Sequence, residues 1–361
     1  MNQKKYRRLL FIVFVVYLCA ILCYFCSTKG MPIAVNSLAV DSATKEEKES
    51  SEIKLMPLGM PVGIYVRAKG VMVLGTGEVK NEQGDLVEPT KDLLQSGGYL
   101  LKLNGENIES IDWLTETMDS WKGGDMDFTL LRDDEEMQVS VTPVRTETAG
   151  YKIGVWIRQD AHGIGTLSYV DENNHFAALG HGITDVDTSE IIDISGGRIY
   201  ESCILSIVKG EKGVPGEMVG NIDYAHGEIL GRIEINNEKG IYGIVSNNQY
   251  FYDEEKALPV ASASEVKKGA AFIRCCVDQE IKDYEIEIES LDVGGFSENR
   301  DLVLKITDRE LLGQTNGIIQ GMSGSPILQD GKIIGAVTHV LVNDPTMGYG
   351  IFIENMLDAA S

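Results

Sequence analysis

Histidine and cysteine are scarce in this chain, and neither is spaced as a metal site requires. The five histidines form no HExxH or comparable ligand pattern among 361 residues. Of the six cysteines, three fall in one apolar run near the N-terminus, and two of the others are adjacent. This spacing predicts neither a disulfide framework nor a zinc ribbon. We therefore expect no metal site and no cofactor.

Basic residues are also few. The chain has 32 Lys and Arg against 55 Asp and Glu, which gives a formal net charge of −23. Because a phosphate backbone requires a basic surface, this balance argues against nucleic acid as a partner. The 43% hydrophobic and 24% charged residues are normal for a folded protein. The length allows two ordinary domains.

Long apolar runs are almost absent, and the single exception is residues 9–26, which follow a basic cluster at Lys4–Arg8. Eighteen uncharged residues suffice to cross a bilayer as a helix, with the basic cluster in the cytoplasm. We expect residues 1–30 to form a cytoplasmic tip and a membrane anchor, which leaves an extracytoplasmic body. A cleaved signal peptide and a buried helix are the alternatives. Residues 31–54 lack apolar periodicity and predict a flexible linker open to proteolysis.

Residues 55–147 predict a small β-rich domain with one helix. Short strands, the Gly97-Gly98 turn and a helix capped by Ser110 precede two closing strands. The string SGGYLLKLNGENI resembles a segment of bacterial PDZ domains. That resemblance implies a peptide added as an extra strand, with Pro57–Ile64 as the carboxylate-binding loop. The implied peptide-binding residues are Gly59, Val62, Gly63, Ile64, Tyr65 and Val66. The alternative is a β-rich spacer whose groove is already occupied.

Residues 148–361 are rich in glycine and β-branched residues. Many short strands with turn signals between them favour a β-barrel or sandwich. Near the end, Gly321-Met-Ser323-Gly-Ser-Pro326 precedes two apolar runs joined by Asp330-Gly331, a strong hairpin signal. Ser323 is thus predicted on a tight loop, where the N–H groups of Gly321 and Ser323 can form an oxyanion hole. The alternative is an ordinary surface turn.

A base and a carboxylate would complete such a site. His181 lies between two glycines at a predicted strand end, and imidazole exchanges protons near neutral pH. Asp308 ends another predicted strand fifteen residues before Ser323 and is our candidate for orienting the imidazole. Asp185 and Asp187 are rivals, although their closeness to His181 suits them better to shaping its loop. With His181 they also define an alternative, a metal-dependent hydrolase.

The strings ALGHGITDVDTSE and ITDRELLGQTNGIIQGMSGSPI, behind a PDZ-like segment, resemble the stage IV sporulation protein B serine peptidases of endospore-forming bacteria. The resemblance implies a chymotrypsin-like double β-barrel with His181 as general base, Ser323 as nucleophile and Asp308 as orienting acid. It also implies a location on the forespore membrane, facing the space between the two forespore membranes. The implied substrates are the enzyme's own N-terminal segment and a membrane-bound regulator of the intramembrane protease that activates the late mother-cell sigma factor.

The sequence therefore predicts a mainly β protein with an anchor, a PDZ domain at 55–147 and a serine peptidase domain at 148–361. One departure from trypsin-like enzymes is Met322, because an aspartate usually precedes the nucleophile there. Activation by a new N-terminus is therefore not expected. The alternative function is a non-catalytic PDZ scaffold that binds an envelope partner protein.

Overall fold

A computed structural model describes residues 53–147, 150–224, 226–292 and 299–360. The predicted anchor at 9–26 and nearly all of the predicted linker lie outside these residues. Within the described ranges, no helix is both long enough and apolar enough to cross a membrane.

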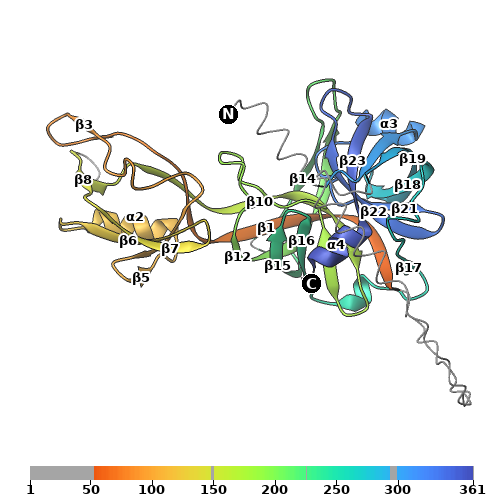
Figure 1. Cartoon of the computed structure of the whole chain (residues 1–361), viewed down its shortest axis with the longest axis horizontal. Coiled ribbons are helices and arrows are strands. Elements are labelled where there is room, and N and C mark those ends of the chain that lie inside the picture. The colour runs from red at the N-terminus through yellow and green to blue at the C-terminus, as the bar shows by residue number, and fades with distance from the viewer. Residues whose placement is uncertain (1–52, 148–149, 225, 293–298, 361) are drawn as a thin grey trace, which may run out of the picture. The chain divides into compact units, whose positions relative to one another are not determined.

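The first barrel is a ring of antiparallel strands in the order β1-β10-β11-β16-β15-β12, closed by pairing of β12 and β10 with β1. Figure 1 labels all of these strands except β11. Their bounds are β1 (Lys54–Thr76), β10 (Val155–Val170), β11 (His175–Ala178), β12 (Ile194–Glu201), β15 (Ile229–Asn237) and β16 (Gly240–Val245).

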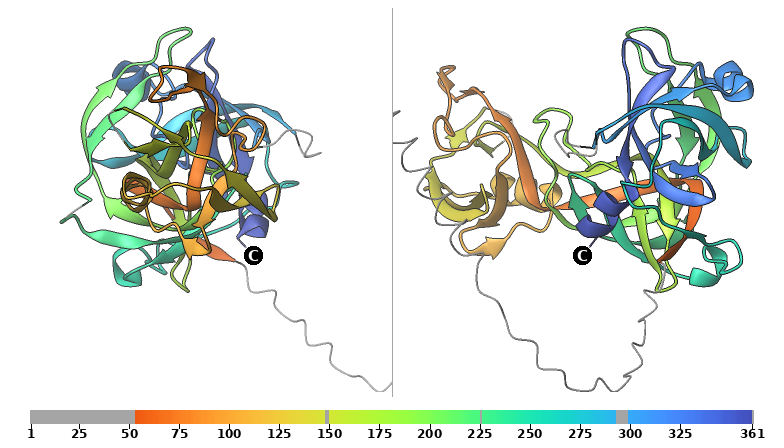
Figure 2. Two further views of the ribbon diagram at one scale, coloured as in Figure 1. Left: turned by 90° about the vertical axis from the view of Figure 1, so that its left-hand side faces the viewer. Right: turned by 45° about the vertical axis from the view of Figure 1, so that its right-hand side comes forward.

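The second barrel closes in the order β18-β19-β20-β23-β22-β21. Its strands carry the cyan and blue colours of the right-hand view in Figure 2. Their bounds are β18 (Gly269–Cys276), β19 (Ile281–Leu291), β20 (Leu302–Ile306), β21 (Pro326–Gln329), β22 (Lys332–Val340) and β23 (Met347–Phe352). Two closed barrels agree with the double β-barrel that the sequence resemblance implied.

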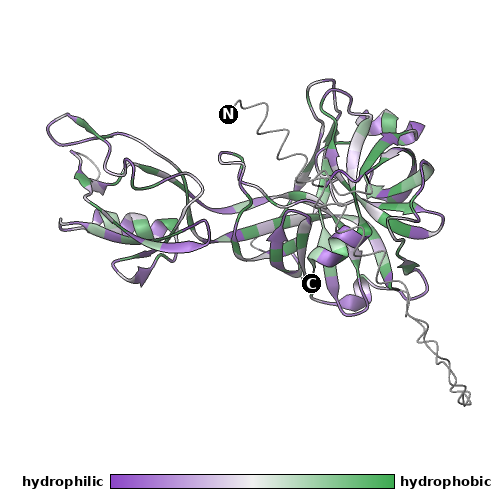
Figure 3. Ribbon diagram, in the orientation of Figure 1, coloured by the Kyte–Doolittle hydropathy of each residue, from purple (hydrophilic) through white to green (hydrophobic). Residues whose placement is uncertain are grey.

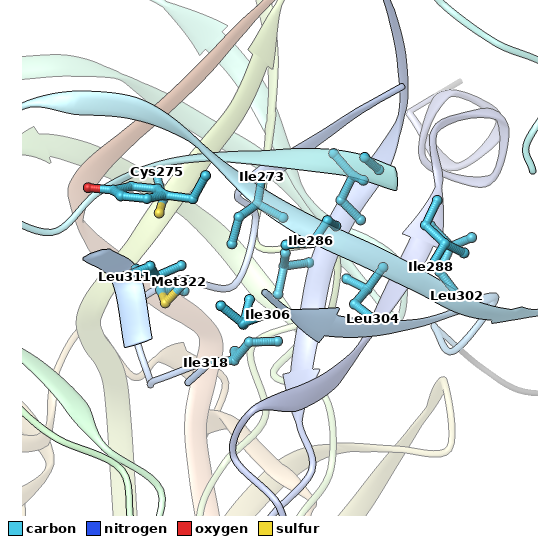
Figure 4. Packing of buried hydrophobic residues seen from close by; sticks show 14 of the residues in the cluster. Ile273, Cys275, Ile286, Ile288, Leu302, Leu304, Ile306, Leu311, Ile318 and Met322 are labelled. Atoms are coloured by element: carbon cyan, nitrogen blue, oxygen red, sulfur yellow. The ribbon is translucent and has the colours of Figure 1, made fainter. Parts of the chain in front are cut away.

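Alternating side chains explain why these strands close into barrels. Along β19, buried Tyr284, Ile286 and Ile288 alternate with exposed glutamates. Because successive side chains of a strand point to opposite faces, one face fills the barrel and the other meets water. The ribbons accordingly change colour in short bands when shaded by hydropathy (Figure 3). The resulting core of the second barrel includes Met322 and Ile318, which lie near Leu311 and Ile306 in Figure 4.

The residues between the barrel portions of β1 and β10, approximately 69–158, form a unit that we call the insert. It holds its own core around Leu100, Leu114 and Phe128. Ser110 caps its helix as predicted, since its side chain accepts the Trp113 N–H. The elements are β2 (Val79–Lys80), β3 (Leu86–Val87), β4 (Tyr99–Leu103), β5 (Glu106–Asn107), α2 (Ile111–Asp119), β6 (Met126–Arg132), β7 (Glu135–Val141), β8 (Val144–Arg145) and β9 (Tyr151–Lys152).

The topology corrects the predicted boundaries at 55–147 and 148–361. The first part of β1 belongs to the first barrel, where it pairs with β10 and β12. The two-barrel fold is therefore interrupted by the insert rather than preceded by it. The sequence hid this because Pro57 and Pro61 indicated a loop. Both prolines lie instead in β1 beside a register shift, where a missing N–H is tolerated.

The predicted peptide-binding residues of the PDZ domain are corrected for the same reason. Gly59, Val62, Gly63, Ile64, Tyr65 and Val66 all lie in the first-barrel part of β1. From Val62 to Arg67, β10 pairs with one edge of the strand and β12 with the other. No backbone edge remains there for an added peptide strand. Gly59 has a φ of +67°, and its α-carbon packs against the Arg274 carbonyl, so it serves a close approach between chain segments.

The remaining elements connect or cover the barrels. Two strands between β12 and β15 in the sequence, β13 and β14, form a hairpin. A β-bridge between Glu217 and Gln320 joins this hairpin to the loop that precedes Ser323. These elements are β13 (Cys203–Val208), β14 (Glu217–Asn221), the 3₁₀ helix η1 (Asn248–Tyr250), β17 (Leu258–Pro259), α3 (Arg309–Thr315) and α4 (Ile353–Ala359).

Candidate active site

Ser323 lies between α3 and β21 on the loop that the sequence predicted. The hairpin after it is confirmed, because Asp330 and Gly331 join β21 to β22 with φ angles of 51° and 78°. Positive φ at both central residues is what a two-residue hairpin turn requires. Ser323 itself is half-buried.

The loop around Ser323 is fixed from both barrels. Met322 is fully buried in the core of the second barrel. From the first barrel, Thr166 on β10 donates its hydroxyl to the Gly321 carbonyl at 2.6 Å and its N–H to the Ser323 carbonyl at 3.0 Å. The apolar side chain thus anchors one side of the loop, while Thr166 orients two of its carbonyl groups.

The N–H groups of Gly321 and Ser323 are the two that the sequence predicted for an oxyanion hole. Neither donates to a protein acceptor in the part of the chain that the structure describes. Their peptide units are held at the carbonyl ends, because the Gln320 oxygen accepts the Met218 N–H and the Met322 oxygen accepts the Ser325 N–H. Fixed, unoccupied donors are what stabilisation of a developing oxyanion needs.

The Ser323 hydroxyl donates a hydrogen bond of 2.6 Å to the backbone carbonyl of Thr338 on β22. A hydroxyl has a single hydrogen to donate, so this proton is not directed at a histidine in the observed arrangement. Rotation about the Cα–Cβ bond of Ser323 would be required before a base could accept it.

His181 follows β11 by three residues, and its ring is held by its own loop. Nδ1 lies 2.9 Å from the Gly182 carbonyl oxygen. Since a carbonyl can only accept, Nδ1 carries the hydrogen, and Nε2 keeps the lone pair that a base uses. Burial lowers the pKa of His181, and the hydrogen bond to Gly182 raises it by a smaller amount. The net lowering keeps the imidazole neutral at pH 7.

A second histidine, which the sequence analysis did not select, lies against the first. The rings of His181 and His339 are 4.8 Å apart between centroids, with their planes inclined by 33°. Burial, with smaller effects from His181 and Arg300, lowers the pKa of His339 to about 4. His339 is therefore uncharged at neutral pH and adds no positive charge beside the candidate base.

His181 and Ser323 line one pocket of about 290 Å³, together with Gly321, Gln320 and Ile164. A neighbouring pocket of about 440 Å³ shares Gln320, Gly321 and residues 162–164, and extends to Met218 on β14. The structure therefore brings together the predicted nucleophile, the predicted base and both residues whose N–H groups were predicted for the oxyanion hole.

Asp308 is not brought to His181. Its side chain caps α3 by accepting the Leu311 N–H at 2.9 Å and lies 3.5 Å from the Glu285 N–H. It is not among the residues that line the pocket with His181 and Ser323. The predicted role of Asp308 is corrected accordingly: the carboxylate has the contacts of a helix cap, and a backbone carbonyl occupies the His181 nitrogen that Asp308 was expected to hold.

Asp185 and Asp187 shape the loop after His181, as their position suggested. Asp185 accepts the N–H groups of Asp187 and Thr188, and both carboxylates contact the guanidinium of Arg158 on β10. Burial would raise the pKa of Asp185, but these hydrogen bonds and the charge of Arg158 outweigh it, so the pKa is lowered. Asp185 is thus an anion committed to Arg158 rather than to a metal.

Three residues beside the site escaped the sequence analysis: Thr166, His339 and Asn236, whose Oδ1 accepts the Ile183 N–H in the loop after His181. Thr166 lies in a stretch of β10 where every residue is buried, and Asn236 lies at the half-buried end of β15, so neither position is marked by alternation. His339 is separated from His181 by more than 150 residues, and only the closure of two barrels brings their rings together. No local pattern signals such contacts.

A family model described as SpoIVB peptidase S55 matches residues 149–357, more than half of the chain. The chain belongs to the SpoIVB peptidase S55 family. The match includes His181, Asn236, Asp308 and Ser323. This SpoIVB-type protein is a serine endopeptidase, so its substrates are polypeptides.

Solved structures resemble the SpoIVB-type chain only distantly. The PDZ domain of the SdrC-like protein from Listeria monocytogenes is 19% identical, with 25% of this chain and 87% of that chain covered and a TM-score of 0.20. Rv3671c from M. tuberculosis H37Rv, a serine-to-alanine mutant in an inactive form, is 13% identical over 54% and 78%, with 0.28. The HtrA-type protease AlgW with a decapeptide is 6% identical over 84% and 64%, with 0.34. No curated protein matches significantly.

Proposed function

We propose that Ser323 is the nucleophile of this serine endopeptidase and His181 its general base. The observation that carries the proposal is their shared pocket, which also holds the free N–H of Gly321. Turning the Ser323 hydroxyl from Thr338 toward Nε2 of His181 lets the base take its proton as the oxygen attacks the scissile carbonyl. The amides of Gly321 and Ser323 then stabilise the oxyanion, an effect of about 3 kcal/mol per donor.

The fate of the proton completes the reaction. The imidazolium returns it to the leaving amine as the peptide bond breaks, which leaves an ester between Ser323 and the acyl part of the substrate. Water, deprotonated by the same imidazole, hydrolyses this ester and restores the free serine. The lowered pKa of His181 supports the first step, because the ring is neutral and able to accept a proton at pH 7.

Labelling of the full chain with a fluorophosphonate probe tests these roles. We expect the wild type to label and Ser323→Ala not to. Ser325→Ala is the matched control, because this serine lies two residues away and its buried hydroxyl has no hydrogen-bond partner in the described ranges. We expect Ser325→Ala to label at the wild-type rate. Labelling of Ser323→Ala at that rate would contradict the proposal.

We further propose a role in sporulation signalling at the forespore membrane, with residues 9–26 as the anchor and the body in the intermembrane space. The family and the sequence of the anchor support it. In this role the enzyme cleaves its own N-terminal segment and a membrane-bound regulator of the intramembrane protease that activates the late mother-cell sigma factor. Membrane fractionation of sporulating cells that produce the full chain or a 31–361 truncation tests the anchor. Recovery of both forms in the soluble fraction would contradict it.

The PDZ-like insert is proposed to bind a peptide of a partner protein. In the insert, residues Met72–Thr76 of β1 pair with residues Val155–Arg158 of β10, and Ile157 packs against the insert core near α2. Because this edge is filled, a peptide that adds to β1 must exchange with residues 155–158. Faster hydrogen exchange at those amides, on addition of peptides with free C-termini, is the expected signature. Unchanged exchange with a bound peptide would place the binding surface elsewhere.

A further inference from the structure

The group that holds the candidate base is a peptide unit and not a carboxylate. The Gly182 carbonyl that accepts the Nδ1–H of His181 belongs to the same amide as the Ile183 N–H. That N–H donates a hydrogen bond of 2.8 Å to Oδ1 of Asn236, at the end of β15. A continuous chain of hydrogen bonds thus runs from Asn236 through one peptide unit to the imidazole.

The side-chain amide of Asn236 is fully committed to the His181 loop. Besides accepting the Ile183 N–H, it donates from Nδ2 to the carbonyl oxygens of Ile183, at 3.0 Å, and Ile192, at 2.9 Å. Two acceptors face Nδ2 and one donor faces Oδ1, so only one orientation of the amide satisfies all three. Asn236 therefore fixes the peptide plane that Gly182 and Ile183 share.

The backbone beside this peptide leaves no room for it to move. The Gly182 N–H donates to the Glu238 carbonyl at 3.2 Å. A Cβ at position 182 would lie 2.6 Å from the Asn237 carbonyl oxygen, so the loop approaches the β15–β16 turn as closely as glycine allows. The Gly182 carbonyl is therefore held toward the ring from both sides: the Gly182 N–H bonds to Glu238, and the Ile183 N–H bonds to Asn236.

We propose that Asn236 is a positioning residue of the peptidase reaction, acting on His181 through the Gly182–Ile183 peptide. This rests on the proposed roles of His181 and Ser323. By accepting the Ile183 N–H, Asn236 polarises the peptide and strengthens its carbonyl as an acceptor, since linked hydrogen bonds reinforce one another. The stronger acceptor keeps the hydrogen on Nδ1 and stabilises the imidazolium that forms when Ser323 is deprotonated.

Substitution of Asn236 and its neighbour separates positioning from folding. Asn236→Ala removes the whole connection. Asn236→Asp keeps the Oδ1 acceptor, removes the donor that faces the Ile183 and Ile192 carbonyls, and adds a negative charge two hydrogen bonds from Nδ1. Asn237→Ala is the matched control, because the Asn237 side chain bonds Ala359 and Lys239 at the same turn but not the His181 loop. The full chain is compared in each case, with thermal unfolding as the measure of folding.

The main readout is the rate of fluorophosphonate labelling as a function of pH. We expect Asn236→Ala to label at least about tenfold more slowly than Asn237→Ala. We expect Asn236→Asp to label with its acid-side midpoint moved to higher pH, because the carboxylate favours the imidazolium. Nitrogen chemical shifts of His181 report its tautomer independently of activity, and a loss of the Nδ1–H form is expected in Asn236→Ala.

Each outcome decides between the proposals. If wild type labels through Ser323 while both alanine variants label alike and His181 keeps its tautomer, the positioning role of Asn236 is overturned alone. If Asn236→Asp folds but its midpoint and its His181 pKa equal those of wild type, the role is also overturned. If Ser323→Ala labels as wild type does, the proposed catalytic roles fail. The tautomer of His181 in Asn236→Ala then shows separately whether Asn236 controls the ring.

Discussion

The two barrels hold their halves of the site by different means. In the second barrel, Met322 anchors the Ser323 loop in a hydrophobic core. In the first barrel, the loop after His181 is fixed by polar contacts, with Asn236 at one end and Arg158 at the other. The residue beside the nucleophile is thus part of a core, whereas the base loop adds an ion pair and side-chain hydrogen bonds to the packing of Ile183 and Ile192.

This difference separates two ways of disturbing the enzyme. Burial is cooperative, so a fault under Ser323 should cost stability of the whole second barrel. Individual hydrogen bonds contribute less to stability each, but they set orientation. Faults under His181 should therefore change catalysis more than the free energy of unfolding. The predictions below test that contrast in order of expected size.

The largest effect is expected from Met322→Asp. Met322 is fully buried among Ile306, Leu311 and Ile318, with no cation in that cluster to pair with a new carboxylate. A buried, unpaired charge costs several kcal/mol, so we expect a loss of about 3–5 kcal/mol in the free energy of unfolding. Urea denaturation measures it. Met322→Leu, the volume-conserving control, should lose less than about 1.5 kcal/mol; equal losses would show that the site is not a tightly packed core.

A smaller loss is expected when the ion pair of the base loop is broken. Arg158→Gln leaves the Asp185 carboxylate, whose side chain is 0% exposed, without its cation. One-sided loss of a buried pair costs about 3–5 kcal/mol, but Arg158 is 33% exposed, so we expect about 2 kcal/mol. Arg232→Gln, which breaks the exposed pair with Glu234, is the control and should change stability by less than about 1 kcal/mol. Equal losses of stability in the two variants would argue against a stabilising buried ion pair between Arg158 and Asp185.

The sequence was sufficient for the parts of the site that are encoded locally. The glycines around Ser323, the Asp330-Gly331 turn and the strand before His181 each depend on a few neighbouring residues, and their structures follow the prediction. The membership of the first part of β1 in the first barrel could not be predicted, because the pairing of Val62–Arg67 with β10 joins segments about 100 residues apart. The partner of His181 was missed for a related reason: a backbone carbonyl leaves no signature in side-chain identity.

Substitutions of Asp308 test whether a backbone carbonyl, and not this carboxylate, holds Nδ1 of His181. The Asp308 carboxylate caps α3, so Asp308→Ala should cost about 1 kcal/mol of stability, as the loss of a cap does. Asp308→Asn keeps a capping oxygen and should be nearly neutral. Fluorophosphonate labelling of both variants is expected to stay within about threefold of wild type, far from the about 10⁴-fold loss typical when a triad aspartate becomes asparagine. A loss of that size in Asp308→Asn would show that Asp308 reaches His181 in the reacting enzyme.

The smallest effect is a pH-dependent one at His339. Its pKa is about 4 in the folded protein against an ordinary value of 6.5, so the unfolded chain binds a proton more readily. The resulting stability is present above pH 6.5 and is lost as the pH falls toward 4. His339→Gln removes this dependence. Because His339 is exposed by its surface area, solvent screens the effect, and we expect the variant to gain only a few degrees in Tm, relative to wild type, between pH 7 and pH 4. If His339→Gln followed wild type, burial would not be lowering the pKa of His339 in the folded protein.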